Sequence, residues 1–98
     1  MPMRLSMDEI TNAVCLNIAE RKGLKPTDVT VQLSWEEDTG YTAEVWTEGR
    51  SQYLVESNLN EAILRYMFSE YNARVFKEQV ELVINDDEEE IQAIIHDN

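Results

Sequence analysis

Residues 28–48 read DVTVQLSWEEDTGYTAEVWTE, and apolar and polar side chains alternate along both halves of this stretch. Such alternation is typical of β-strands that bury one face. The side chains expected to face inward in the first half are those of Val29, Val31, Leu33 and Trp35. In the second half they are those of Tyr41, Ala43 and Val45. Asp38 and Gly40 separate the halves and favour a turn, so the stretch predicts an antiparallel hairpin.

Helices are predicted on both sides of this hairpin. Upstream, Ser6 and Glu9 in SMDE have the spacing of a capping box, and Gly23 suits the left-handed residue that ends a helix. Downstream, residues 51–56 (SQYLVE) continue the hairpin as a third strand of a meander. A second helix is then expected to begin near Asn58, with Glu61 as its capping partner, and to end near Asn72. Its predicted apolar stripe consists of Leu59, Ala62, Ile63, Tyr66 and Met67.

The rest of the chain predicts two further strands. Val80, Leu82 and Ile84 are in phase with one another, and EIQAIIH follows at 90–96. The order is therefore α-β-β-β-α-β-β. We predict an α+β two-layer sandwich in which an antiparallel sheet carries two helices on one face. At 98 residues the chain has the size of one domain, spanning 1–98.

Charge is distributed unevenly along the chain, which has 20 acidic and 8 basic residues and a net charge of −12. Residues 1–35 are neutral, so residues 36–98 carry the whole excess. A field of this sign repels nucleic-acid phosphates and anionic lipids, and we expect direct binding to neither. The α-β-β-β-α order resembles that of double-stranded-RNA-binding domains, but Glu61 stands where those domains need positive charge.

Five consecutive carboxylates occupy residues 86–90: Asp86, Asp87, Glu88, Glu89 and Glu90. They are contiguous and contain no glycine, unlike a calcium-binding loop, and neighbouring side chains in extended backbone point to opposite faces. A solvated hairpin tip is therefore predicted, with weak cation binding left open. Glu36, Glu37 and Asp38 form the tip of the first hairpin. The two tips together are a candidate acidic patch if they lie side by side.

Residues for catalysis or metal binding are few. The chain has one cysteine and one histidine, whereas a structural zinc site needs four such ligands. A Cys15–His96 dyad would require both side chains in one cleft. Cys15 lies in an apolar helical stretch, where a thiol usually packs as a small hydrophobe, and His96 is expected at the surface. We predict no enzyme activity, no metal and no cofactor.

Three apolar side chains are expected on outward faces of the strands. Trp46 lies between Glu44 and Glu48, Val83 alternates with the inward Leu82, and Ile94 is a further member. Trp46, Val83 and Ile94 form the candidate interaction surface, for a basic protein partner or for a second copy in a homodimer. Scattered exposed apolar residues are an alternative explanation. An anionic decoy for the basic groove of a nucleic-acid-binding protein is the other function considered.

Three stretches resemble the YxcD-like family of small uncharacterised proteins from spore-forming Gram-positive bacteria. They are residues 9–33 (EITNAVCLNIAERKGLKPTDVTVQL), 40–50 (GYTAEVWTEGR) and 58–67 (NLNEAILRYM). The resemblance implies a cytoplasmic single domain and brings no active-site residues. A cytoplasmic location also agrees with the single cysteine and with an N-terminus that lacks an apolar signal-like segment.

Overall fold

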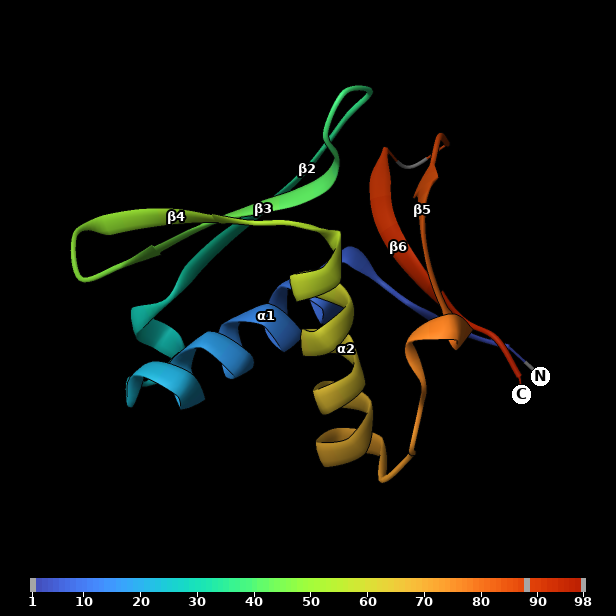
Figure 1. The fold of residues 1–98 in the computed structure, drawn as a ribbon, viewed down its shortest axis with the longest axis horizontal. Helices are drawn as coiled ribbons and strands as arrows, with labels where there is room; N and C mark the ends of the chain where they lie inside the picture. The colour runs from blue at the N-terminus through green and yellow to red at the C-terminus, as the bar shows by residue number, and fades with distance from the viewer. Residues whose placement is uncertain (1, 88, 98) are drawn as a thin grey trace.

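The computed structural model describes residues 2–87 and 89–97, which form two α-helices and two three-stranded antiparallel sheets (Figure 1). The elements in chain order are β1 (Met3–Leu5), α1 (Met7–Lys22), β2 (Thr30–Glu36), β3 (Gly40–Thr47), β4 (Arg50–Leu54), α2 (Glu56–Tyr71), β5 (Val80–Asn85) and β6 (Glu90–Ile95). Short 3-10 turns, η1 (Pro26–Asp28) and η2 (Lys77–Gln79), precede β2 and β5. The predicted α+β class and its element order are confirmed.

The strands divide into two sheets rather than one. The first sheet has the order β2-β3-β4, and the second has the order β1-β6-β5. After α2, residues 72–79 carry the chain away from β4 to the far side of the helices (Figure 1). There β5 and β6 form their own hairpin and pair with β1, with Met3 opposite Ile95 and Leu5 opposite Ala93. The short strand β1 is an addition to the predicted order.

The first helix has the predicted ends. Ser6 Oγ accepts a hydrogen bond from the Glu9 backbone N–H at 3.1 Å, and Glu9 Oε1 accepts one from the Ser6 N–H at 3.5 Å. Gly23 closes the helix in the left-handed conformation, with φ of 69°. The capping box therefore satisfies two backbone donors that the first turn leaves without helical partners.

The second helix begins earlier than predicted. Its first residue is Glu56, and Asn58 lies inside the first turn, where Asn58 Oδ1 accepts a hydrogen bond from the Val55 N–H at 3.0 Å. The prediction that Asn58 precedes the helix was wrong, because its side chain caps the helix by reaching back. The helix ends as expected at Asn72, which has a left-handed φ of 53°. Its predicted apolar stripe is buried: Leu59, Ala62, Ile63, Tyr66 and Met67.

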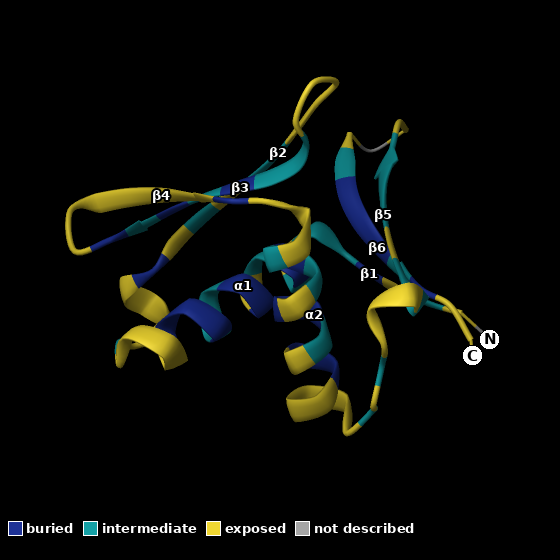
Figure 2. Ribbon diagram, viewed as in Figure 1, coloured by how far each residue is buried: buried dark blue, intermediate teal, exposed yellow. Residues whose placement is uncertain are grey.

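The helices supply the middle of two core clusters (Figure 2). Ile10 and Ile63 pack with residues of the second sheet, whereas Val14 and Leu59 pack with residues of the first sheet. Side chains that touch both clusters are Leu33, Tyr41 and Leu82. These shared contacts connect the two core clusters. Among the described residues, neither helix combines the length and the hydropathy needed to cross a membrane.

Candidate functional site

A groove of about 460 Å³ opens between the two sheets. We call it the inter-sheet groove, and it is lined by Met7, Leu33, Ser34, Trp35, Ile84, Asp86, Glu89 and Ile91. Its apolar side chains come from the start of α1 and from β2, β5 and β6. The strands β2 and β5 are the edges of their respective sheets. The groove therefore joins an apolar lining to two strand edges.

Trp35 is the largest side chain of the inter-sheet groove, and 46% of its surface is exposed. It belongs to the inward face of β2, as the alternation predicts. However, the β2–β3 hairpin projects beyond the helices that cover the rest of this face (Figure 1). The indole instead rests against Tyr41, with ring centroids 6.5 Å apart and an interplanar angle of 58°. Alternation alone does not predict this exposure, and the one available signal was the position of Trp35 next to an acidic turn.

One acidic hairpin tip lines this groove, and the other begins directly after its tryptophan. Trp35 is followed directly by Glu36, while Asp86 and Glu89 line the groove from the β5–β6 hairpin. The two tips point to the same end of the molecule in Figure 1. The described members of the candidate acidic patch are Glu36, Glu37, Asp38, Asp86, Asp87, Glu89 and Glu90. Its remaining member, Glu88, lies outside the described residues.

Two further carboxylates act on Tyr41, the aromatic neighbour of Trp35. Burial raises the pKa of Tyr41 above its ordinary value, and the carboxylates of Glu56 and Glu81 raise it further. A carboxylate disfavours the phenolate because two negative charges repel each other. The same field favours a cation beside Tyr41. The groove thus combines apolar surface with a preference for positive charge.

The structure places the predicted interaction surface on two different sheets. Trp46 is half-buried on β3, opposite Thr30 and Ser51, on the face of the first sheet that is turned away from the helices. Val83 and Ile94 share the outer face of the second sheet, because β5 and β6 pair in register. Val83 and Ile94 therefore belong together, and Trp46 stands apart from them.

The predicted catalytic candidates make separate local contacts. The Cys15 Sγ donates to the Val29 carbonyl at 3.6 Å, and burial raises the pKa of the thiol. His96 Nε2 lies 2.7 Å from Glu81 Oε1, beyond the end of β6. Within residues 2–87 and 89–97, no three His, Cys, Asp or Glu side chains are grouped so that they could hold a metal ion.

Comparison with known proteins identifies the family. A family model described as "Protein of unknown function (DUF2653)" matches residues 1–87, and the chain belongs to this family. Searches of curated proteins and of solved structures found no significant match. The family description names no activity or ligand, so a proposal about function depends on the geometry described above.

Proposed function

We propose that this member of the DUF2653 family is a non-catalytic protein-interaction domain, and that its inter-sheet groove binds a basic, partly apolar segment of a partner protein. One observation carries the proposal: an apolar groove of about 460 Å³ contains an exposed tryptophan and two carboxylates of the β5–β6 hairpin, and the acidic tip of the β2–β3 hairpin points to the same end of the molecule. Ligand sites commonly combine an apolar lining with a few polar groups that fix orientation.

Each part of the groove suits one part of such a segment. Leu33, Ile84 and Ile91 can pack against an aliphatic side chain of the ligand. Trp35 can stack against an arginine or lysine, since a cation over an indole ring is attracted to its π face. Asp86 and Glu89 can pair with a second basic side chain. The edge strands β2 and β5 offer backbone groups to an extended peptide.

Charge supports a basic partner over a neutral or acidic one. The chain carries −12, and Asp86 and Glu89 place two carboxylates in the lining of the groove itself. Such a field speeds the encounter with a cationic segment and repels an anionic one. The sequence-based hypothesis placed Trp46 at the centre of the binding surface, whereas this proposal places Trp35 there. The surface of Trp46, Val83 and Ile94 stays a prediction.

The experiment is a peptide titration followed by fluorescence anisotropy. A labelled peptide of alternating arginine and leucine should bind the full chain, and a peptide of alternating glutamate and leucine should not. Trp35→Ala should weaken binding about tenfold or more, equivalent to about 1.4 kcal/mol. Trp46→Ala is the matched control and should leave the affinity unchanged. Equal effects of the two substitutions, or no binding of the basic peptide, would refute the proposal.

An anionic decoy is a second proposal with less support. The shared acidic end favours it, because a row of carboxylates can stand in for phosphates in a basic groove. However, acidic residues also lie on α1, on α2 and in η2, including Glu20, Glu61 and Glu78, so the negative charge is not confined to one face. A decoy complex should weaken steeply with salt and be insensitive to Trp35→Ala, which separates it from groove binding.

The remaining parts of the proposal concern chemistry and location. We propose no catalysis, since the raised pKa of the Cys15 thiol lowers its thiolate fraction and His96 is engaged by Glu81. We propose no direct nucleic-acid or membrane binding, because of the negative charge. The resemblance to YxcD-like proteins and the single cysteine support a cytoplasmic protein of a spore-forming bacterium.

A further inference from the structure

A further pocket, of about 300 Å³, lies where α1, β4 and α2 meet, and we call it the α1–β4 pocket. Its lining residues are Ile18, Arg21, Lys22, Gln52, Leu54 and Asn58. In Figure 1, β4 leads directly into α2, so the first turn of α2 adds Asn58 to the lining. The α1–β4 pocket shares no lining residue with the inter-sheet groove. It is therefore a separate candidate site.

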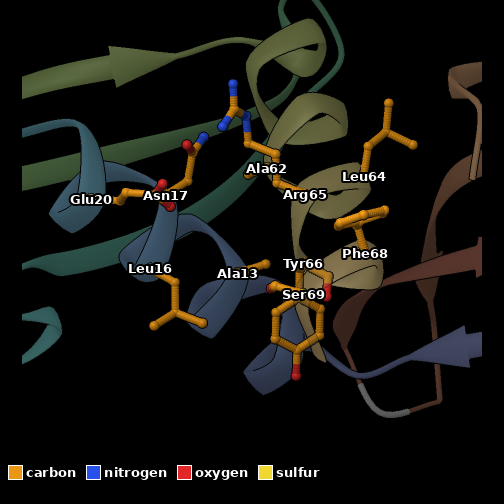
Figure 3. Close-up of a pocket in the computed structure, with 10 residues that line it drawn as sticks. All are labelled: Ala13, Leu16, Asn17, Glu20, Ala62, Leu64, Arg65, Tyr66, Phe68 and Ser69. Carbon is orange, nitrogen blue, oxygen red and sulfur yellow. Dashed lines mark hydrogen bonds between the residues drawn. The ribbon is translucent and has the colours of Figure 1, made fainter. Parts of the chain in front are cut away.

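The α1–β4 pocket is basic, although the chain as a whole carries −12. Arg21 and Lys22 line it, and none of its lining residues is acidic. Glu20 precedes Arg21 in the sequence, but it lines a different recess, the one between α1 and α2 drawn in Figure 3. Glu56 begins α2, and its carboxylate acts on Tyr41 instead. The lining of the α1–β4 pocket therefore carries two positive charges and no negative one.

The two cations of the α1–β4 pocket retain donors for an external ligand. Lys22 Nζ donates a hydrogen bond of 3.1 Å to Oγ1 of the buried Thr47, which orients the ammonium and leaves two of its three N–H groups for another acceptor. Within residues 2–87 and 89–97, Arg21 has no hydrogen-bond or ion-pair partner. Arg65, in the recess of Figure 3, differs because it is ion-paired with Glu61 at 3.6 Å. The Arg21 guanidinium is thus available to an anion from outside the chain.

Two amides and an apolar floor complete the α1–β4 pocket. The Asn58 Oδ1 accepts the Val55 N–H at 3.0 Å, so the Nδ2 group is the end of this amide that remains as a donor. Gln52 supplies a second amide from β4. Ile18 and Leu54 are buried beneath these polar groups and contribute apolar surface. An apolar lining with a few polar groups is the usual composition of a small-molecule site.

We propose that the α1–β4 pocket binds a small organic phosphate monoester. The phosphoryl group of such an ester carries a charge of roughly −1.5 to −2 at neutral pH and has three strong acceptor oxygens. These match the two cations Arg21 and Lys22 and the neighbouring amide donors. A carboxylate has a single charge and two oxygens, so it would leave part of the cationic charge uncompensated. The organic group of the ester packs against Ile18 and Leu54.

The size of the pocket and the charge of the whole chain select a small ligand over a polymer. Ligand pockets commonly enclose roughly 300–1,000 Å³, and the α1–β4 pocket lies at the lower end of this range. A nucleic acid would carry many phosphates past a chain of −12 and would be repelled along its length. A monoester brings one phosphoryl group to the one basic pocket. The proposal is therefore consistent with the absence of nucleic-acid binding proposed above.

Titration of the ¹⁵N-labelled full chain with phenyl phosphate tests the proposal. The side-chain resonances of Arg21, Gln52 and Asn58 should shift and saturate. Inorganic phosphate, which lacks the ring, and benzoate, which lacks the second charge, should both bind more weakly. Arg21→Gln should raise the Kd of phenyl phosphate about tenfold. Arg74→Gln is the matched control, since Arg74 is an exposed arginine outside the pocket lining, and it should leave the Kd unchanged.

A second variant tests the amide donor while keeping the helix cap. In Asn58→Asp the carboxylate can still accept the Val55 N–H and suits the first turn of a helix, so the Tm without ligand should not fall. The variant removes the Nδ2 donor and adds a like charge, so it should also raise the Kd of phenyl phosphate about tenfold or more.

Three results would overturn the proposal. They are the absence of saturable shifts at the pocket, equal affinities for phenyl phosphate and benzoate, and equal effects of Arg21→Gln and Arg74→Gln. An unchanged Kd in Asn58→Asp would contradict the binding mode. Because the α1–β4 pocket and the inter-sheet groove share no lining residue, failure of this binding and failure of peptide binding are separate results.

Discussion

Single side chains at the helix ends decide where the helices of this protein begin and end. Ser6 and Glu9 close the first turn of α1 through reciprocal hydrogen bonds. In α2, Asn58 lies inside the helix and accepts one such bond, from the Val55 N–H. The first cap was predictable because both its partners follow the common spacing. The second was not, because an asparagine with a glutamate three residues later has the same spacing whether it precedes the helix or lies within it.

Removal of the first cap should destabilise the protein measurably. We expect Ser6→Ala to lower the free energy of unfolding by about 1 kcal/mol, because the Glu9 N–H loses its acceptor. Urea denaturation followed by circular dichroism measures this change. Ser57→Ala is a matched control, since Ser57 is exposed in the first turn of α2 and should change stability little. Equal changes for the two variants would show that the Ser6 hydrogen bond contributes nothing.

The Tyr71 hydroxyl should titrate at unusually high pH. It donates a hydrogen bond of 2.6 Å to Glu9 Oε2, and this bond raises the pKa of Tyr71 to about 12, with smaller effects from desolvation and charge. The folded pKa exceeds the ordinary value of 10.0, so the stabilising effect is complete below pH 10 and is lost between about pH 10 and 12.

Ultraviolet titration of tyrosinate can follow this group. Glu9→Gln should move the pKa of Tyr71 down toward 10.0, and Tyr71→Phe should remove the corresponding absorbance step. The pKa of Tyr53 is raised by a different carboxylate, Glu44, so the Glu9 substitution should leave it unchanged. A Tyr71 step that keeps its position in Glu9→Gln would disprove the assigned cause.

At the scale of elements, the alternating and helical patterns predicted every strand and helix longer than three residues. The exception was β1, because three residues are too few to establish a period. Its pairing is dictated by β6, which is distant in sequence. The division into two sheets also depends on distant contacts, since β5 could equally have extended the first sheet by periodicity alone. Local pattern thus determined element type, and long-range packing determined sheet membership.

The short strand β1 should nevertheless contribute strongly to stability. Leu5 is fully buried in the core cluster that joins α1 to the second sheet. Leu5→Ala should therefore cost about 2–5 kcal/mol through lost burial and the cavity left behind. Arg4→Ala, on the opposite face of the same strand, removes a 2.7 Å hydrogen bond to Gln92 and should cost much less. Chemical denaturation compares the two, and similar losses would mean that β1 is not anchored by Leu5.

Across the whole molecule, the acidic turns of the two hairpins lie toward one end. The β2–β3 and β5–β6 tips both point to this end, and Asp86 and Glu89 of the second tip line the inter-sheet groove. The charge imbalance between the two halves of the chain was visible in the sequence. That the two acidic turns point to one end of the molecule was not, because it depends on how the two sheets are oriented.

Repulsion within the acidic end should make stability depend on salt. Raising sodium chloride from about 0.01 M to about 0.1 M shortens the Debye length from about 30 Å to about 10 Å. We therefore expect Tm to rise over this range. A variant with Asp87→Asn and Glu90→Gln should show a smaller rise, because fewer like charges remain to be screened. Thermal unfolding by circular dichroism measures both proteins, and a Tm that falls with salt would contradict the account.

The most direct test of the central claim uses the two tryptophans as separate reporters. Their indole N–H groups give two resonances in a ¹⁵N-labelled protein, and Trp35→Phe assigns them. As the arginine–leucine peptide is added, the Trp35 resonance should shift and reach a plateau when the site is full. The Trp46 resonance should stay in place. A shift of Trp46 alone would favour the surface predicted from the sequence, and no shift of either would contradict binding in the inter-sheet groove.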